Sequence, residues 1–233
     1  MLTSIRSGFA AEGMFMPVNV LSASESATLL ANMLEYDARV GLRAGAITRF
    51  KPHLLATWAA ELVRHPAIVG AVAAALNPED LVIWSSDVNL KPGDSKRFFS
   101  VHQDSTYAGL EPAHRAVTAW LAVTPSNEHT GCMTYFPGTH ASQLRHATSA
   151  DDGSNMLAFG QTIPDAVLHS LCPPGSERPV VLKPGQMALH AFSLAHSSGV
   201  NYSGEDRIGF AIRYVAPDVA KVGRTREAAS LVR

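Results

Sequence analysis

The sequence has few cysteines and few charges, and each shortage excludes a class of protein. Among 233 residues there are two cysteines, Cys132 and Cys172, too few for a disulfide framework and too far apart for a CxxC redox pair or a zinc knuckle. We therefore expect two reduced thiols in a cytoplasmic protein. Charged residues make up 17% of the chain and the net charge is −1, so no nucleic-acid partner is indicated.

Long apolar runs are also missing. A helix that spans a bilayer needs about 20 apolar residues, and the most apolar stretch, residues 63–76, is short and contains His65 and Pro66. The first residues lack the apolar core of a secretory signal peptide. We expect no membrane partner and a cytoplasmic location.

The first third of the chain predicts helices. Ser22 or Ser24 can cap a helix that runs to about Tyr36, because apolar residues recur there on one face. Further helices are expected over His53–Arg64 and Pro66–Leu76, the second with proline in its first turn. Residues 1–80 thus form a helical front part.

From residue 81 the pattern changes to short apolar strands separated by turn residues. Strands are expected at residues 81–90, 97–101, 115–123, 131–136, 180–182, 187–191 and 207–215. This spacing is typical of an antiparallel sandwich or jelly roll. We expect one domain over 1–233, with a β core at 81–216, a lid or binding loop at 145–178 and a loosely held basic tail at 217–233.

Three residues could hold a metal ion. His102 and Asp104 flank Gln103, and residues i and i+2 of a strand point to the same side. His196, which follows an apolar strand, could complete the set, and two imidazoles with one carboxylate cap one face of a ferrous ion and leave three positions open. His190 competes as third ligand, and a histidine-x-aspartate pair also arises by chance.

Arg207 favours His196 over His190, because it lies eleven residues after His196, whereas that distance from His190 falls on Asn201. A guanidinium binds a carboxylate through two parallel hydrogen bonds. The metal and Arg207 could therefore clamp a dicarboxylate at both ends, with the Ser198 hydroxyl beside it. Instead of binding a ligand, Arg207 could form a surface salt bridge, and Ser198 could be an ordinary serine in a turn.

The chain resembles the phytanoyl-CoA dioxygenase family of iron(II)/2-oxoglutarate oxygenases. Five stretches carry the resemblance: HQDSTY at 102–107, VTAWLAV at 117–123, GCMTYFPGTH at 131–140, LHAFSLAHSSGVNYS at 189–203 and DRIGFAIRY at 206–214. It implies a mainly β fold, a double-stranded β-helix (cupin-like jelly roll) with flanking helices. It also implies that His102, Asp104 and His196 hold Fe(II), and that Arg207 and Ser198 hold the 5-carboxylate of 2-oxoglutarate.

The resemblance also suggests which other residues lie near the ligands. Trp120 and, less strongly, Gln103, Lys51 and Asn89 are expected beside the cosubstrate. Candidates for substrate contacts are Trp84, Val101, Tyr107, Ala108 and the stretch from Asn155 to Gln161. Many bacterial relatives carry large aromatic residues where this chain has Val101 and Ala108, so the pocket is wider if both side chains face it.

The expected activity is hydroxylation of an unactivated C–H bond in a small or medium-sized metabolite, with O₂ consumed, succinate and CO₂ released, and ascorbate as a stimulant in vitro. Asp104 occupies the position that related halogenases leave open for chloride, which disfavours halogenation; desaturation and cyclisation stay open. The protein is expected as a monomer or homodimer. The alternatives are a cupin-like metal-dependent isomerase or hydrolase without O₂ chemistry, and a degenerate binding module without activity.

Overall fold

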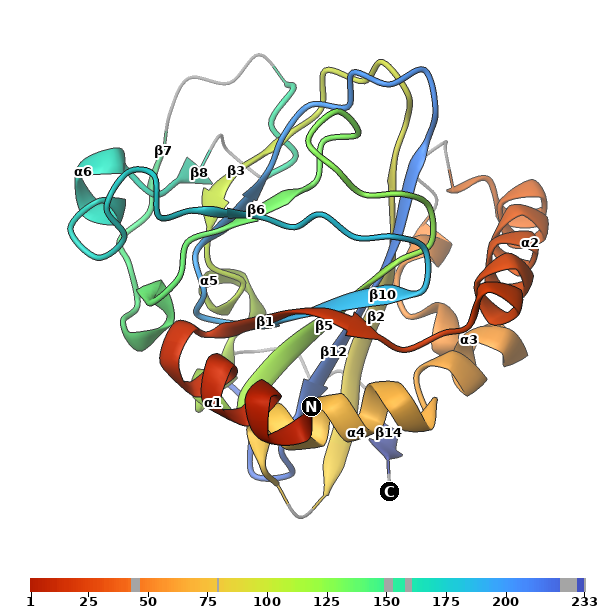
Figure 1. Cartoon of the computed structure of the whole chain (residues 1–233), viewed down its shortest axis with the longest axis horizontal. Helices are drawn as coiled ribbons and strands as arrows, with labels where there is room; N and C mark the ends of the chain where they lie inside the picture. Colours follow the sequence, from red (N-terminus) through yellow and green to blue (C-terminus); the bar gives the residue numbers. More distant parts are fainter. Residues whose placement is uncertain (43–46, 79, 149–152, 158–160, 223–229, 233) are drawn as a thin grey trace.

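Two antiparallel sheets face each other in the computed structural model, which describes residues 1–42, 47–78, 80–148, 153–157, 161–222 and 230–232 (Figure 1). The larger sheet has six strands in the order β1-β10-β5-β12-β2-β14. Their bounds are β1 Met14–Asn19, β10 Gln186–Ala191, β5 Ala116–Ala122, β12 Arg207–Val215, β2 Leu81–Lys91 and β14 Ser230–Val232.

The smaller sheet has the order β3-β11-β6-β9, with β3 Phe99–His102, β11 His196–Ser198, β6 Met133–Tyr135 and β9 Arg178–Pro179. In this sheet His196 pairs directly with His102 on one side and with Tyr135 on the other. Pairing across the sheet therefore brings together two histidines that are far apart in the sequence.

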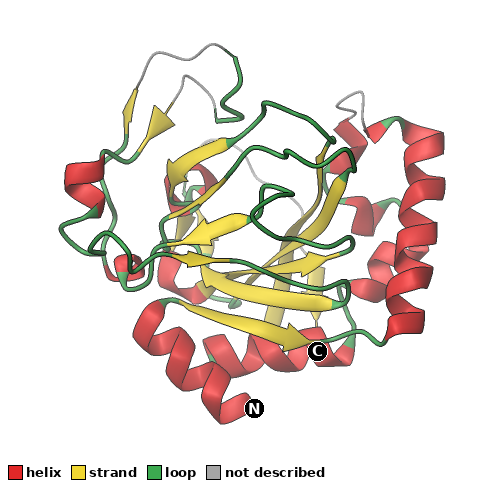
Figure 2. Cartoon of the chain, turned by 45° about the horizontal axis from the view of Figure 1, so that its top comes forward, coloured by secondary structure: helices red, strands yellow, loops and turns green. Residues whose placement is uncertain are grey.

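Helices cover the outer face of the larger sheet (Figure 2). These are α1 Leu2–Glu12, α2 Ala23–Val40, α3 Thr57–Leu62 and α4 Pro66–Leu76. Strand β12 shows how the face is filled: the Phe210 ring packs edge-on against Trp58 of α3 at 5.9 Å, and the Tyr214 hydroxyl donates to the Val63 carbonyl at 2.7 Å. Side chains alternate along a strand, so Arg207, Ala211 and Arg213 face the opposite sheet and line the space between the sheets.

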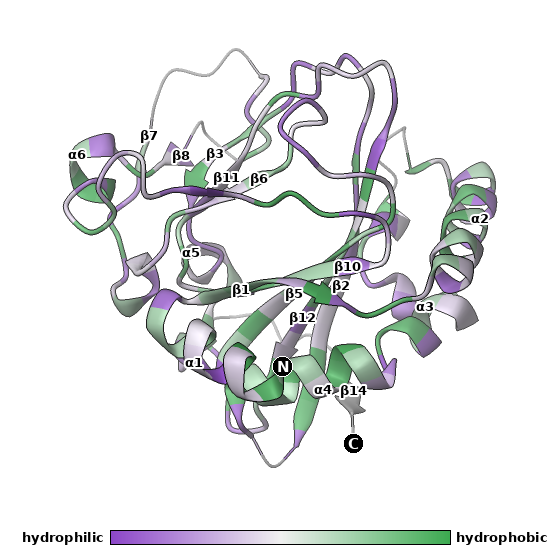
Figure 3. Ribbon diagram, viewed as in Figure 1, coloured by the Kyte–Doolittle hydropathy of each residue, from purple (hydrophilic) through white to green (hydrophobic). Residues whose placement is uncertain are grey.

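Figure 3 shows hydrophobic residues along α4, β5 and β10 and many hydrophilic residues in the connecting loops. None of the helices in the described ranges is long and apolar enough to cross a membrane. The short elements are η2 Ile47–Arg49, η3 Pro52–Leu54, α5 Ser105–Ala108, β4 Leu110–Glu111, η4 Ala113–Arg115, η5 Thr139–Ala141, β7 Ala147–Thr148, β8 Gln161–Thr162, α6 Asp165–Leu168 and β13 Ala220–Lys221.

The mainly β fold with flanking helices agrees with the sequence prediction, and the differences lie in the front part. Ser22 caps α2 through a reciprocal bond pair with Glu25, as its sequence favours, but the helix continues past Tyr36. The helix expected over His53–Arg64 is divided into η3 and α3, because Ala56 has an extended backbone between them. Strand β1 was not predicted. It belongs to the helical front part of the chain and forms an edge strand of the larger sheet.

Two predictions at the other end of the chain were wrong. No named strand covers residues 180–182; β9 lies just before them, and Leu182 makes only an isolated bridge to Ser126. The tail is not loose in its described parts, because β13 pairs with β4 and β14 pairs with β2. The expected loop at 145–178 contains the β7–β8 hairpin and α6, and its residues 149–152 and 158–160 lie outside the description.

Candidate metal and cosubstrate site

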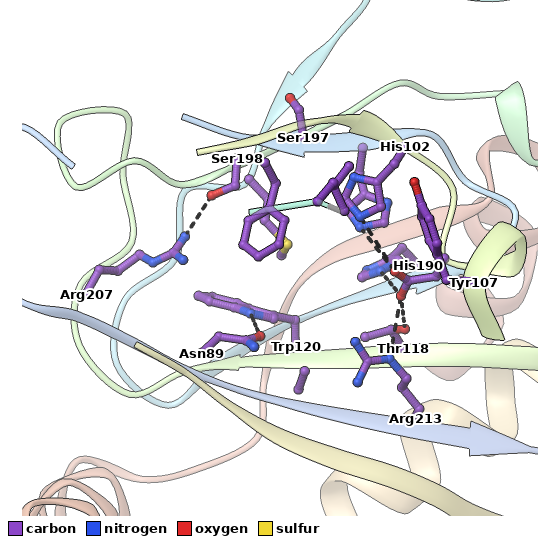
Figure 4. A pocket seen from close by; sticks show the side chains of 16 residues that line it. Asn89, His102, Tyr107, Thr118, Trp120, His190, Ser197, Ser198, Arg207 and Arg213 are labelled. Atoms are coloured by element: carbon purple, nitrogen blue, oxygen red, sulfur yellow. Dashed lines mark hydrogen bonds and ion pairs between the residues drawn. The ribbon is translucent and has the colours of Figure 1, made fainter. Parts of the chain in front are cut away.

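Three donor atoms converge between the two sheets. The Nε2 atoms of His102 and His196 lie 3.7 Å and 3.8 Å from the same oxygen, Oδ1 of Asp104. One donor atom from each of these residues lies within 4.8 Å of the others (Figure 4). Two imidazole nitrogens and a carboxylate oxygen suit Fe(II) and leave open positions for ligands.

Backbone carbonyls fix the orientation of both rings. His102 Nδ1 donates to the Ser100 carbonyl at 2.8 Å, and His196 Nδ1 donates to the Leu194 carbonyl at 3.0 Å. A carbonyl only accepts, so the proton of each neutral ring lies on Nδ1 and the Nε2 lone pair is free for a metal. Burial also lowers the pKa of His196 to about 3, which keeps the ring neutral as a ligand must be.

Asp104 reaches the histidines by a different route from the one predicted. Strand β3 ends at His102, and Asp104 has helical backbone angles at the N-cap of α5, so the two residues do not share a strand face. The tight turn after β3 returns the carboxylate toward the metal position instead. The prediction that His102 and Asp104 point at one metal position is therefore confirmed, but the reason given for it, a shared strand face, is wrong.

The second oxygen of Asp104, Oδ2, is surrounded by donors. The Thr118 hydroxyl donates to it at 3.3 Å, Arg213 Nε lies at 3.6 Å and His190 Nε2 at 3.9 Å. Burial alone would raise the pKa of this carboxyl, but the surrounding imidazoles of His102, His190 and His196 hold the pKa well below its usual value. The carboxylate is thus charged, with Oδ1 presented to the metal and Oδ2 held by the protein.

His190, the competing third ligand, serves this arrangement rather than the metal. Its Nδ1 lies 2.7 Å from the Tyr135 hydroxyl, and its Nε2 lies 3.9 Å from Oδ2 of Asp104, whereas His102 and His196 approach Oδ1. Within the described ranges, the group of residues able to hold one ion contains His196 and not His190. The arginine spacing in the sequence therefore indicated the right histidine.

At the other end of the cavity lies a buried cation with spare donor capacity. Arg207 is 3% exposed, and its Nη1 donates to the Gly131 carbonyl at 2.8 Å and to Ser198 Oγ at 3.4 Å. Its Nε is buried with no hydrogen-bond partner in the described parts of the chain. Burial lowers the pKa of Arg207 to about 10, so the guanidinium stays charged at neutral pH. The carboxylate of a ligand would satisfy both the charge and the open donor.

Trp120 and Asn89 line the space between the metal donors and Arg207 (Figure 4). The indole ring lies 5.4 Å from the Arg207 guanidinium carbon, and its Nε1 donates to Asn89 Oδ1 at 3.2 Å. Since the Asn89 carbonyl is engaged, its amide nitrogen is the group that a ligand can use. The space has a volume of about 280 Å³.

A second cavity, of about 470 Å³, adjoins the first at Asp104, Tyr107 and Arg213. Three of the predicted residues, Lys51, Trp84 and Ala108, line it. Arg213 forms an ion pair with Asp87 on the neighbouring strand β2. Neither Asp87 nor Arg213 was predicted. Both could have been, because Asp87 lies on the same face of β2 as Asn89, and Arg213 lies on the same face of β12 as Arg207.

Four predicted residues do not line either cavity. Val101 precedes His102 on β3 and so points to the opposite side, where it packs on Leu144 and other apolar residues. Gln103 is buried, and its amide bonds the backbone around the turn at 139–144 and Ser193.

Asn155 and Gln161 lie beside β3, where Asn155 forms an isolated bridge with Phe98. The Asn155 amide donates to Ser100 Oγ at 3.0 Å, and the Gln161 carbonyl accepts from the same hydroxyl. Residues 158–160 of the predicted stretch lie outside the described residues. Among the described residues of this stretch, Leu157 lines the first cavity.

Lys91 is the most unexpected residue near the anion end. The sequence places it where a strand meets a Pro-Gly turn, a position typical of an exposed lysine, but it is 1% exposed and its Nζ donates to Ser198 Oγ at 2.7 Å. The sequence did contain a signal for this. Side chains two residues apart on a strand face the same side, so Lys91 shares its face with Asn89, and it pairs with Arg207 on β12.

Comparison with known proteins agrees with this geometry. The model of the phytanoyl-CoA dioxygenase (PhyH) family matches residues 9–209. Ectoine dioxygenase of Bordetella parapertussis is 27% identical over 210 residues, which cover 82% of this chain and 68% of the relative.

Two solved structures share the fold. The non-heme monooxygenase ThoJ, solved in its apo form, superposes with a TM-score of 0.83 and 32% identity over 98% of this chain and 83% of its own. EctD from S. alaskensis, solved with 2-oxoglutarate and 5-hydroxyectoine, superposes with a TM-score of 0.70 and 22% identity. The match covers 91% of this chain and 74% of that structure. The chain therefore belongs to the phytanoyl-CoA dioxygenase family, a family of non-heme iron- and 2-oxoglutarate-dependent oxygenases.

Proposed function

We propose that this protein is an iron(II)- and 2-oxoglutarate-dependent hydroxylase that acts on an unactivated C–H bond of a small or medium-sized metabolite. One observation carries the proposal. Within one cavity, Asp104 Oδ1 and two imidazole Nε2 atoms converge at one end, and the unsatisfied donor of buried Arg207 lies at the other. This is the arrangement that a 2-oxo dicarboxylate needs to bind a metal and a cation together.

The described residues fit both groups. His102, Asp104 and His196 would hold Fe(II), and Arg207 and Ser198 would bind the distal carboxylate of 2-oxoglutarate. When bound, the iron and its cosubstrate supply the activation of O₂ that hydroxylation needs. The chain's own contribution is orientation: Thr118 and His190 hold Asp104 Oδ2, backbone carbonyls hold the imidazoles, and the Trp120 indole forms the wall between the two ends.

The substrate side is the second cavity. It meets the first cavity at Asp104, so a molecule bound there has its reacting carbon next to the metal position. Trp84 gives it an apolar wall, Tyr107 borders the passage between the cavities, and Ala108 leaves room where a larger side chain would fill it. The volume suits a small metabolite, and the ectoine dioxygenase relative supports that size class.

Asp104 also favours hydroxylation over halogenation, because its carboxylate occupies the position that a halide would need. Desaturation and ring closure use the same residues and differ in how the substrate is placed. A cytoplasmic location and the state of monomer or homodimer stay predictions.

The test is consumption of cosubstrate by the full chain. Purified protein with Fe(II), ascorbate and 2-oxoglutarate should form succinate slowly in air and faster when a substrate is found by screening small polar metabolites. Succinate should not form under argon. Turnover of any screened metabolite without O₂ and 2-oxoglutarate would instead support the isomerase or hydrolase alternative, and a weak visible band on anaerobic addition of Fe(II) and 2-oxoglutarate would argue against it.

A further inference from the structure

We propose that the substrate is a metabolite with an apolar body and an acidic group, and that Lys221, on the C-terminal segment after β12, binds the acidic group and so determines specificity. The inference rests on the proposed function, because it names the chemical class of substrate for the second cavity. The family match ends at residue 209. The segment that carries Lys221, residues 216–222, therefore lies outside the part of the chain that the family match covers.

Backbone hydrogen bonds hold this segment against the substrate side of the fold. Lys221 of β13 pairs with Leu110 of β4, and the Val222 N–H donates to the Gly109 carbonyl at 2.8 Å. Gly109 has a φ of +58°, and it directly follows Ala108, which lines the second cavity. The segment is thus fixed beside the cavity, and its Lys221 side chain forms part of the cavity wall.

The ammonium of Lys221 lies on an aromatic wall. Its Nζ is 5.9 Å from the centre of the Trp84 ring, and Trp84 packs on Phe192 with the ring centres 6.0 Å apart. Lys221 lines only the second cavity, whereas Asp104 and Arg213 line both cavities. The lysine therefore lies away from the junction with the metal position, where it would bind a part of the substrate that does not react.

Positive charge is in excess among the described residues that line the second cavity. The cations are Lys51, Arg213 and Lys221, and the carboxylates are Asp87 and Asp104. Asp87 forms an ion pair with Arg213, and Asp104 presents Oδ1 to the metal position. Both carboxylates are therefore engaged within the site. An acidic group on the substrate would balance the charge of the lysines, because an ammonium and a carboxylate form a charge-assisted hydrogen bond.

The solvent-exposed rim of the same cavity is apolar. Ile47 is 83% exposed, Phe50 47% and Tyr107 44%, and all three line the cavity. Exposed apolar side chains that gather around one cavity mark a place where a ligand covers them. A wholly polar metabolite would leave this rim and the wall formed by Trp84 and Phe192 without apolar contacts. The substrate class that fits both the rim and the lysines is an acid with an apolar body.

The experiment is isothermal titration calorimetry with matched probes and the full chain, kept anaerobic and saturated with Fe(II) and 2-oxoglutarate. The probes are ω-phenylalkanoic acids of increasing chain length and their primary amides, because each pair has nearly the same size and differs in charge. The best acid of the series should bind roughly tenfold more tightly than its amide, the effect of one charge-assisted hydrogen bond. If no acid binds more tightly than its amide, the proposal is overturned.

Variants assign the preference to Lys221. Lys221→Met removes the ammonium, so it should weaken the acid roughly tenfold and leave the affinity for the amide nearly unchanged, whereas Lys221→Arg should keep the preference for the acid. Lys183→Met is the matched control: it removes the same charge from an exposed residue that lines neither cavity, and it should bind both probes like the wild type. Equal loss for acid and amide in Lys221→Met, or equal effects of the two lysine-to-methionine changes, would overturn the role of Lys221.

A metal-free sample distinguishes this inference from the proposed function beneath it. Lys221 and the aromatic wall need no iron, so the preference for the acid should persist in the metal-free chain. If it persists there and depends on Lys221, while the chain with Fe(II), 2-oxoglutarate and O₂ forms no succinate, the proposed function is wrong and the cavity's preference for an acidic ligand stands. If succinate forms and no acid is preferred, only this inference is wrong.

Discussion

The indole of Trp120 occupies the space that a side chain at Gly209 would need. A Cβ at position 209 would lie 2.0 Å from Cζ2 of Trp120, and the same ring lies over the Arg207 guanidinium carbon at 5.4 Å. Gly209 is two residues from Arg207 on the inner face of β12. The missing side chain therefore leaves the space that the tryptophan ring fills beside Arg207.

Gly209→Ala should move the indole and damage both stability and cosubstrate binding. Overpacking of this kind costs about 1–3 kcal/mol, and we expect a loss of that size in the free energy of unfolding by urea, with a raised KM for 2-oxoglutarate. Gly70→Ala is the control, since a Cβ at this position of α4 meets nothing within 4 Å. It should be neutral or stabilising, and a neutral Gly209→Ala would show that the ring contact is unimportant.

The metal assignment predicts which histidines matter for iron. Combined replacement of His102, Asp104 and His196 by alanine should abolish Fe(II) binding, measured by metal content after anaerobic dialysis, because it removes all three donor atoms. His114→Ala changes an exposed histidine of η4 and should keep full iron content. A triple variant that binds iron like the wild type would refute the assignment.

His190 should affect iron affinity without being a ligand. His190→Phe removes the group that faces Asp104 Oδ2 and the partner of Tyr135. Residues that orient a ligand in this way typically contribute 10- to 100-fold to metal affinity, and we expect about that loss in competition with a chelator. A loss as complete as in the triple variant would mean that His190 binds the metal directly.

Ala108 should control substrate access and not the cosubstrate. Ala108→Trp fills part of the second cavity, which the residue lines, and leaves the first cavity unchanged. The expected result is slow succinate formation without substrate at the wild-type rate, and loss of the stimulation by substrate. The matched change Val101→Trp should leave that stimulation and reduce stability, since Val101 packs on an apolar cluster behind β3.

Two buried histidines should make the metal-free protein less stable in mild acid. Burial lowers the pKa of His53 to about 4 and that of His196 to about 3, below the value of about 6.5 in an unfolded chain. The folded state then binds fewer protons, so this stability is present above about pH 6.5 and is lost as the pH falls. The slope approaches about 1.4 kcal/mol per pH unit for each group.

Urea unfolding of the metal-free protein between pH 7 and pH 5 measures this effect. His53→Gln isolates one of the two groups, because His53 is not one of the three metal donors and its Nδ1 lies 2.6 Å from Ser86 Oγ. The variant should lose about half of the pH dependence that the two histidines contribute. An unchanged slope would mean that folding does not lower the pKa of His53.

Local patterns in the sequence were sufficient for several elements. The serine, glutamate and apolar residues at the start of α2 specify a capped amphipathic helix, and Pro66 defines the start of α4. The sequence of β5 is apolar except for Thr118, which is typical of a strand with both faces buried, and every residue of β5 is buried. These features depend on neighbours in the chain and are visible without tertiary contacts.

The sequence by itself determined the chemistry: two histidines, an aspartate, and an arginine eleven residues after the second histidine. Only the tertiary structure decided which oxygen of Asp104 faces the metal, that Val101 points away, and that Lys91 is buried beside Ser198. The reason is physical. Residue type fixes what a side chain can bind, whereas its direction and burial depend on strand pairing and turns between segments about a hundred residues apart, which no local pattern encodes.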